Sequence, residues 1–101
     1  MIFQLTVPAA VPGVEEIRVL EWHLELGSAI ATGELIVELE THKAIIEVRA
    51  GQAGFLRAIL AQGGDWRAIG LPLSLVSSDA DEQLPIDLSA ASAMLVDFEV
   101  T

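Results

Sequence analysis

A single lysine stands between two alternating runs in the segment ELETHKAIIEVRA, residues 38–50. Lys43 is the only lysine of the chain, so it carries the only side-chain ε-amine. Apolar and polar residues alternate over 35–40 and again over 44–49, which is typical of the two strands of a β-hairpin. The short polar break between the runs supplies turn chemistry. The pattern therefore predicts an exposed lysine at or beside the tip of a hairpin.

Two kinds of chemistry are open to such a lysine. A lysine in a turn is ordinarily a solvated charge. Alternatively, its amine is an attachment point, because acylation would remove the charge and turn the side chain into a long tether. The sequence contains no Ser-His-Asp arrangement, no glycine-rich phosphate loop and no spacing of metal ligands. These features favour a carrier of chemistry over a catalyst, with no metal site.

Composition narrows the class of protein. A chain of 101 residues with 52% hydrophobic content is expected to form one small domain with its own core. The absence of cysteine excludes a disulfide scaffold and a thiolate site, and fits a cytoplasmic location. A net charge of −10 argues against nucleic acid as a partner. No signal peptide is visible, and no apolar run approaches the ~20 residues that span a bilayer, so no membrane association is expected.

Short strands separated by turn signals fill residues 1–77, which predicts an all-β sandwich or barrel. A weak internal repeat supports this prediction, because residues 27–39 align with residues 64–76 at a constant offset. Gly27 then falls on Gly64, where the chain must turn through positive φ or approach itself closely. Two similar halves predict two stacked sheets related by an approximate two-fold axis.

The remaining residues, 78–101, have a different character. They contain six acidic residues and no basic one, and they begin with the solvated stretch SSDADEQLP. Apolar and acidic residues then alternate near the end, so residues 94–100 are expected to add a strand to a sheet edge of their own domain or of a neighbouring copy. A short helix capped by Asp87 or Ser89 is the alternative for the start of this stretch.

A family resemblance gives the hairpin a more specific meaning. ELETHKAIIEVRA resembles the E-(S/T)-D-K-A-x-x-(E/D)-V motif of lipoyl domains, the swinging-arm carriers of 2-oxoacid dehydrogenase complexes. The similarity extends over about residues 3–77, and includes the Gly-Asp turn and the Pro-Leu pair of the second half. It implies a flattened β-barrel of two four-stranded sheets with quasi-two-fold symmetry for residues 1–77, followed by an acidic tail over 78–101.

The resemblance also assigns roles to residues. Lys43 stands where the family carries lipoic acid in amide linkage. Neighbouring residues of the hairpin would be read by partner proteins, and an acidic loop would lie near it. The residues concerned are Glu40, Thr41, His42 and Ala44 in the hairpin, and Glu15 and Glu16 in the loop.

The partners implied by the resemblance are those of a carrier. A lipoate ligase or lipoyl transferase would load the lysine. A thiamine-dependent decarboxylase, an acyltransferase and a dihydrolipoyl dehydrogenase would then act on the carried group in turn. The domain itself would have no active site. It would be a monomer or a weak homodimer, either free-standing or part of a dihydrolipoyl acyltransferase.

Departures from the motif bear on which partners recognise the hairpin, and two alternatives to a lipoyl carrier stay open. His42 stands where the family usually has Asp, and Arg49 where a proline often follows the valine. A biotin carrier has the same fold, but typically has methionine on both sides of its lysine, unlike His42 and Ala44 here. An unmodified adaptor module is the other alternative, although it would need no lysine. Trp22 and Trp66 are expected to be core or half-buried anchors.

Overall fold

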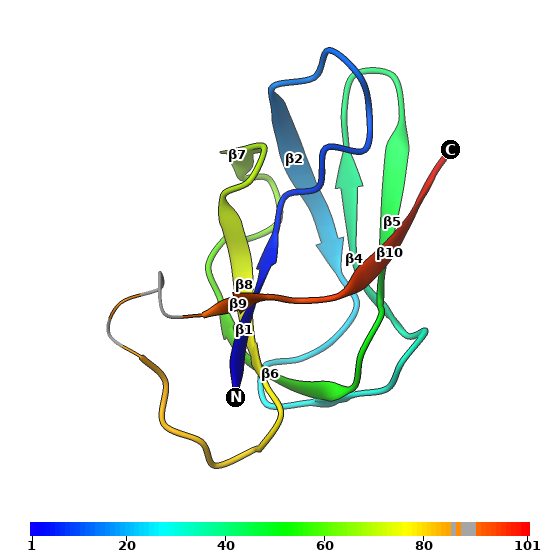
Figure 1. The fold of residues 1–101 in the computed structure, drawn as a ribbon. Coiled ribbons are helices and arrows are strands. Elements are labelled where there is room, and N and C mark those ends of the chain that lie inside the picture. Colours follow the sequence, from blue (N-terminus) through cyan, green and yellow to red (C-terminus); the bar gives the residue numbers. More distant parts are fainter. Residues whose placement is uncertain (86, 88–90) are drawn as a thin grey trace.

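The computed structural model describes residues 1–85, 87 and 91–101. In this part of the chain all regular structure is β, and ten strands form two facing sheets (Figure 1). The first sheet has the order β3-β6-β8-β1-β9, and the second has the order β10-β5-β4-β2-β7. The strands of the first sheet are β1 (Ile2–Thr6), β3 (Ala29–Ile30), β6 (Gly54–Ile59), β8 (Pro72–Ser77) and β9 (Ser92–Ala93). Those of the second are β2 (Glu16–Trp22), β4 (Leu35–Glu40), β5 (Ile45–Ala50), β7 (Trp66–Ala68) and β10 (Val96–Val100).

The core lies between the two sheets. In β2 and β5, buried residues alternate with more exposed ones, so one face of each strand points into the core, whereas β8 is buried along almost its whole length. Large side chains from both sheets are fully buried together, and they include Leu5, Ile17, Ile36, Leu39, Ile46, Leu56 and Leu73. This burial fixes the register of the strands, because a slip by one residue would turn the apolar set toward water.

Strands β1–β4 and β5–β8 repeat the same pairing pattern. β2 pairs with β4 and β7, while β6 pairs with β8 and β3. Gly27 and Gly64 lie at φ +89° and +96°, so both copies turn through the left-handed region where a side chain would be strained. The repeat seen in the sequence therefore corresponds to a structural repeat.

The all-β sandwich expected from the sequence is confirmed, with one addition. The two predicted four-stranded sheets each gain a fifth strand, β9 beside β1 and β10 beside β5. Both added strands come from the last residues of the chain. The alternative helix near 87–89 falls largely outside the described residues. No helix in the described part of the chain is long and apolar enough to cross a membrane.

The two tryptophans differ. Trp22 is half-buried, and its indole N–H donates to the Ala61 carbonyl oxygen at 2.8 Å. The expectation of an anchoring role is wrong for Trp66, which is 52% exposed. Trp66 lies in β7, a three-residue strand at the edge of its sheet, where no further strand covers its side chain.

Candidate functional site: the lysine hairpin

The turn between β4 and β5 is held by one threonine. The Thr41 N–H donates to the Ala44 carbonyl oxygen at 2.9 Å. The Thr41 hydroxyl oxygen accepts the N–H groups of Lys43 at 3.1 Å and Ala44 at 3.0 Å. No described residue other than glycine has a positive φ, so this turn needs no glycine. A hydroxyl that accepts two backbone donors makes the tip a defined turn and not a loose loop.

His42 and Lys43 form the exposed tip of this turn. Among the described residues, Lys43 makes no ion pair, so its ε-amine projects into water. An amine in this position is open to an enzyme that modifies it. The hairpin can therefore offer a nucleophilic nitrogen.

The arms of the hairpin are fixed to the sandwich beneath it. Leu39 and Ile46 face each other across β4 and β5, and both are buried in the core. On the outer face, the Arg18 guanidinium of β2 donates to the Glu40 carboxylate. The predicted hairpin residue Glu40 therefore joins the hairpin to the neighbouring strand.

Four glutamates lie side by side across the outer face of the lysine-bearing sheet. The strand registers place Glu21 opposite Glu38, Glu38 opposite Glu47, and Glu47 opposite Glu99. We call these residues the glutamate row. Like charges directly opposite one another destabilise a sheet. The Arg49 guanidinium offsets part of this charge, because its Nη2 lies 3.9 Å from Glu47 Oε1, and the His23 ring is within hydrogen-bond distance of Glu38, with Nε2 2.5 Å from Oε1.

The structure places the predicted loop residues at the hairpin end. Glu15 and Glu16 are exposed at the start of β2, and Figure 1 shows the loop before β2 beside the tip of the β4–β5 hairpin. The Ile69 N–H donates to the Glu15 carbonyl oxygen at 3.0 Å, which fixes this loop to the end of β7. Glu15 and Glu16 therefore lie at the same end of the sandwich as the hairpin tip, on the β7 side of β2.

Two features of the site escape sequence reasoning. The first is the Thr41 hydroxyl, which accepts two backbone N–H groups and so stabilises the turn directly. The second is the grouping of His23 with Glu21 and Glu38, which offers three ligand atoms within 4.8 Å of one another on an exposed surface. Only the pairing register of β2 and β4 brings Glu21 and Glu38, the two carboxylate neighbours of His23, together.

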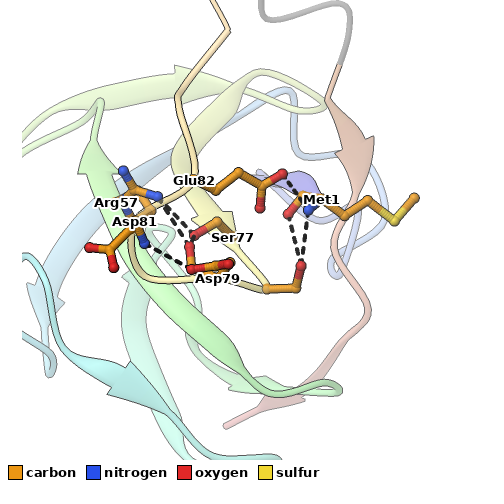
Figure 2. A network of polar contacts seen from close by, with 7 residues as sticks. Met1, Arg57, Ser77, Asp79, Asp81 and Glu82 are labelled. Carbon is orange, nitrogen blue, oxygen red and sulfur yellow. Dashed lines mark hydrogen bonds and ion pairs between the residues drawn. The ribbon is translucent and has the colours of Figure 1, made fainter.

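The opposite end of the sandwich has a polar network of its own (Figure 2). The Met1 amine donates to the Ser78 hydroxyl at 3.0 Å and forms an ion pair with Glu82. The Arg57 guanidinium donates to the Ser77 hydroxyl at 3.0 Å. This network joins the start of β1 to the segment that follows β8.

Comparison with known proteins identifies the family of the chain. The sequence profile of the biotin/lipoyl family, described as biotin-requiring enzyme, matches residues 3–74. The chain is 36% identical over 73 residues to the dihydrolipoyllysine-residue succinyltransferase component of the 2-oxoglutarate dehydrogenase complex of Staphylococcus saprophyticus, an alignment that covers 72% of this chain and 17% of the relative. The corresponding component of Bartonella vinsonii is 38% identical over 80 residues, covering 79% of this chain and 20% of the relative.

A third relative aligns with more of the chain. The dihydrolipoyllysine-residue acetyltransferase component of the pyruvate dehydrogenase complex of Zymomonas mobilis is 28% identical over 93 residues, which is 91% of this chain and 21% of the relative. The chain thus spans about a fifth of the length of these relatives. The matched residues contain both halves of the sandwich and the lysine hairpin between them. On this evidence the chain belongs to the biotin/lipoyl family, whose domain is a carrier and not a catalyst.

Proposed function

We propose that this domain carries a lipoyl group in amide linkage on Lys43 and presents it to the enzymes of a 2-oxoacid dehydrogenase-type complex. The observation that carries the proposal is the position of the only ε-amine of the chain. It lies exposed at the tip of a hairpin whose turn is fixed by Thr41. An attaching enzyme thus meets one amine in one defined turn.

The residues of the chain fit this group without a binding pocket. Attachment would form one amide bond between Lys43 Nζ and the carboxyl carbon of the acid, with loss of the activating group and a proton. A bound lipoyl group would supply a disulfide that can be reduced and acylated. The chain supplies the tether and the rigid base. Tethering raises the effective concentration of the carried group at each active site that the arm can reach.

The partners follow from the names of the relatives. Those proteins are acyltransferase components of 2-oxoglutarate and pyruvate dehydrogenase complexes. We therefore propose a lipoate ligase or lipoyl transferase as the loading enzyme. A decarboxylase, an acyltransferase and a dihydrolipoyl dehydrogenase would use the loaded arm. The hairpin residues Glu40, Thr41, His42 and Ala44, with the acidic loop at Glu15 and Glu16, would form the surface that these proteins read.

Biotin is the weaker candidate for the attached group. The residues that flank Lys43 are His42 and Ala44, and neither matches the methionine pair typical of biotin carriers. The names of the relatives above all refer to lipoyl-dependent complexes. Both observations favour a lipoyl group over biotin.

The test is the intact mass of the protein after co-expression with a lipoate ligase or with a biotin ligase. We expect the mass to rise by one lipoyl group with the first enzyme and to stay unchanged with the second. The Lys43→Arg variant keeps the positive charge but has no amine that can be acylated, so it should gain nothing. A lipoyl mass on that variant, with its fold unchanged by circular dichroism, would refute Lys43 as the attachment site.

A further inference from the structure

The last residues of the chain join the two sheets. We call residues 91–101 the strap. Its first part, β9, pairs in parallel with β1, and its second part, β10, pairs antiparallel with β5 (Figure 1). One short segment thus closes the side of the sandwich where β1 and β5 would otherwise be edge strands.

The strap is fitted to the domain at its middle. Met94 is only 7% exposed and belongs to the core, and its N–H donates to the Gln4 carbonyl oxygen at 3.0 Å. The Leu95 N–H donates to Gln52 Oε1 at 2.8 Å. The Leu95 carbonyl oxygen accepts the Gly51 N–H at 2.8 Å. These contacts place the strap in a specific register and not merely against an apolar surface.

Gly51 is matched to the strap. A Cβ atom at this position would lie 2.8 Å from the Leu95 carbonyl oxygen and 2.9 Å from its carbonyl carbon. The three nearest atoms that it would meet all belong to strap residues 95 and 96. The backbone of Gly51 is not in the left-handed region, so an alanine here would be opposed by the strap and not by local strain.

The strap also completes the outer arm of the lysine hairpin. In an antiparallel sheet, the backbone groups of a central strand point alternately to its two neighbours. Ile45 of β5 lies opposite Glu40 of β4, and on its other side its backbone exchanges two hydrogen bonds with Thr101, at 2.9 Å and 2.8 Å. Ile45 is two residues from Lys43. The distal end of the strap therefore holds the base of the turn that carries the lysine.

We infer that the strap is a positioning element for the lysine hairpin, which keeps the outer arm in the geometry that proteins acting on Lys43 recognise. The inference rests on the proposed function. Without the strap, β5 becomes an edge strand, and its outward backbone groups lose their partners. β5 would then have β4 as its only neighbouring strand, and the tip of the hairpin would spend part of its time in other conformations. An enzyme that recognises this turn would then find the recognisable conformation in a smaller fraction of the molecules.

The distal end of the strap is open to perturbation. Phe98 and Val100 are each 45% exposed, although they lie opposite the buried residues Val48 and Ile46. Because these two side chains are largely uncovered, backbone bonds contribute most of the attachment there. Changes in the strap should thus loosen the hairpin without unfolding the core.

The experiment uses full-length chains with Gly51→Ala and, as a matched control, Gly63→Ala. Gly63 also has no positive φ, and its added Cβ would meet only the Leu20 carbonyl oxygen at 3.5 Å, an ordinary contact. Two quantities are measured: hydrogen exchange at the Ile45 amide, and the steady-state kinetics of lipoate attachment to Lys43. Gly51→Ala should speed exchange at Ile45 about tenfold. It should raise KM for the carrier about threefold with kcat unchanged, because about a third of the hairpins remain competent. Gly63→Ala should match the wild type in both.

A second pair of variants changes only the end of the strap. Thr101→Pro removes the N–H that donates to the Ile45 carbonyl oxygen, whereas Thr101→Ser keeps this N–H and also a hydroxyl like the one that donates to the same oxygen at 3.4 Å. We expect the proline variant to reproduce the KM effect more weakly and the serine variant to have none. The Thr41 amide, which bonds within the turn, should stay protected throughout and report that the hairpin is still formed.

The outcomes separate this inference from the proposed function. Faster exchange at Ile45 with an unchanged KM would overturn the positioning role. Exchange at Ile45 that neither Gly51→Ala nor Thr101→Pro alters would overturn the hold of the strap on the hairpin. Failure of the wild type to accept lipoate would refute the proposed function instead, and the exchange data would still report whether the strap holds β5.

Discussion

The two ends of the sandwich repeat the same local contacts. At the hairpin end, the Thr41 N–H donates to the Ala44 carbonyl oxygen at 2.9 Å, and the Thr41 hydroxyl accepts the Ala44 N–H at 3.0 Å. At the other end, the Ser78 N–H donates to the Met1 carbonyl oxygen at 3.0 Å, and the Ser78 hydroxyl accepts the Met1 amine at 3.0 Å. A hydroxyl-bearing residue thus closes the last strand pair of both halves.

The two ends differ in what joins the strands. At one end, His42 and Lys43 link β4 to β5 and form the exposed tip. At the other, β8 runs on into the tail, and the Met1 amine pairs with Glu82 instead (Figure 2). The repeat therefore determines where the strands end at both ends of the sandwich. The short link formed by His42 and Lys43 occurs at one end only, and this link presents the lysine at a turn.

The first prediction moves the lysine to the other end. The offset that aligns Gly27 with Gly64 also aligns Lys43 with Ala80. We expect the double variant Lys43→Arg, Ala80→Lys to gain no lipoyl group, because the transplanted lysine would lie in an exposed segment with no hairpin around it. Intact mass after co-expression with lipoate ligase measures this all-or-none effect.

A single variant, Ala80→Lys with Lys43 intact, is the control for folding and should gain one group only. Modification of the transplanted lysine would mean that the ligase reads the end of the sandwich and not the turn.

The second prediction compares the two hydroxyls. Thr41→Ala leaves two backbone N–H groups of the turn without their acceptor, and should lower the free energy of unfolding by about 1 kcal/mol. Ser78→Ala should cost less, about 0.5 kcal/mol, because the exposed Met1 amine keeps Glu82 and water as partners. Urea denaturation of the two variants gives the difference.

Thr41→Ser restores the acceptor and should recover most of the lost stability. If Thr41→Ala and Ser78→Ala lowered the free energy of unfolding equally, the second hydrogen bond that the Thr41 hydroxyl accepts would contribute nothing to stability.

The third prediction concerns the outer faces of the two sheets. Glu47 is one of the two inner members of the glutamate row, whereas Gln4 occupies the corresponding place on β1, where it lies opposite Leu75. Glu47→Gln should raise the free energy of unfolding by about 0.5 kcal/mol at low salt, because it relieves like-charge contacts with both neighbours. The gain should fall at ~1 M salt, where the Debye length is only about 3 Å.

Glu25→Gln is the matched control, since Glu25 is an exposed loop residue outside the row. The same gain in that variant would attribute the effect to net charge and not to the row. Thermal melts at two salt concentrations suffice for the comparison.

Local patterns can be predicted from the sequence, and long-range pairing cannot. The hairpin around Lys43 is contiguous, so alternation and a polar break predict it. The repeat is visible because the glycines at positive φ must recur. By contrast, the glutamate row needs the registers of four strands, and alternation within one strand does not give its neighbours.

Edges explain the remaining differences. The size of Trp66 predicts an anchoring role, but exposure depends on whether another strand lies beyond it, and β7 is the last of its sheet. A strand can be expected near the C-terminal end of the chain, but nothing local in residues 94–100 says that β5 receives it. The fit of Gly51 to Leu95 specifies that pairing, and it is a contact between residues far apart in the sequence.

The pairing of Thr101 with Ile45 also decides how the domain can be joined to other proteins. A partner fused after Thr101 would start beside the lysine, whereas one fused before Met1 would start at the opposite end of the sandwich (Figure 1). A short flexible linker at the first position would hold a fused enzyme near Lys43 at millimolar effective concentration. The same linker placed before Met1 would have to span the length of the domain before the fused enzyme could reach Lys43.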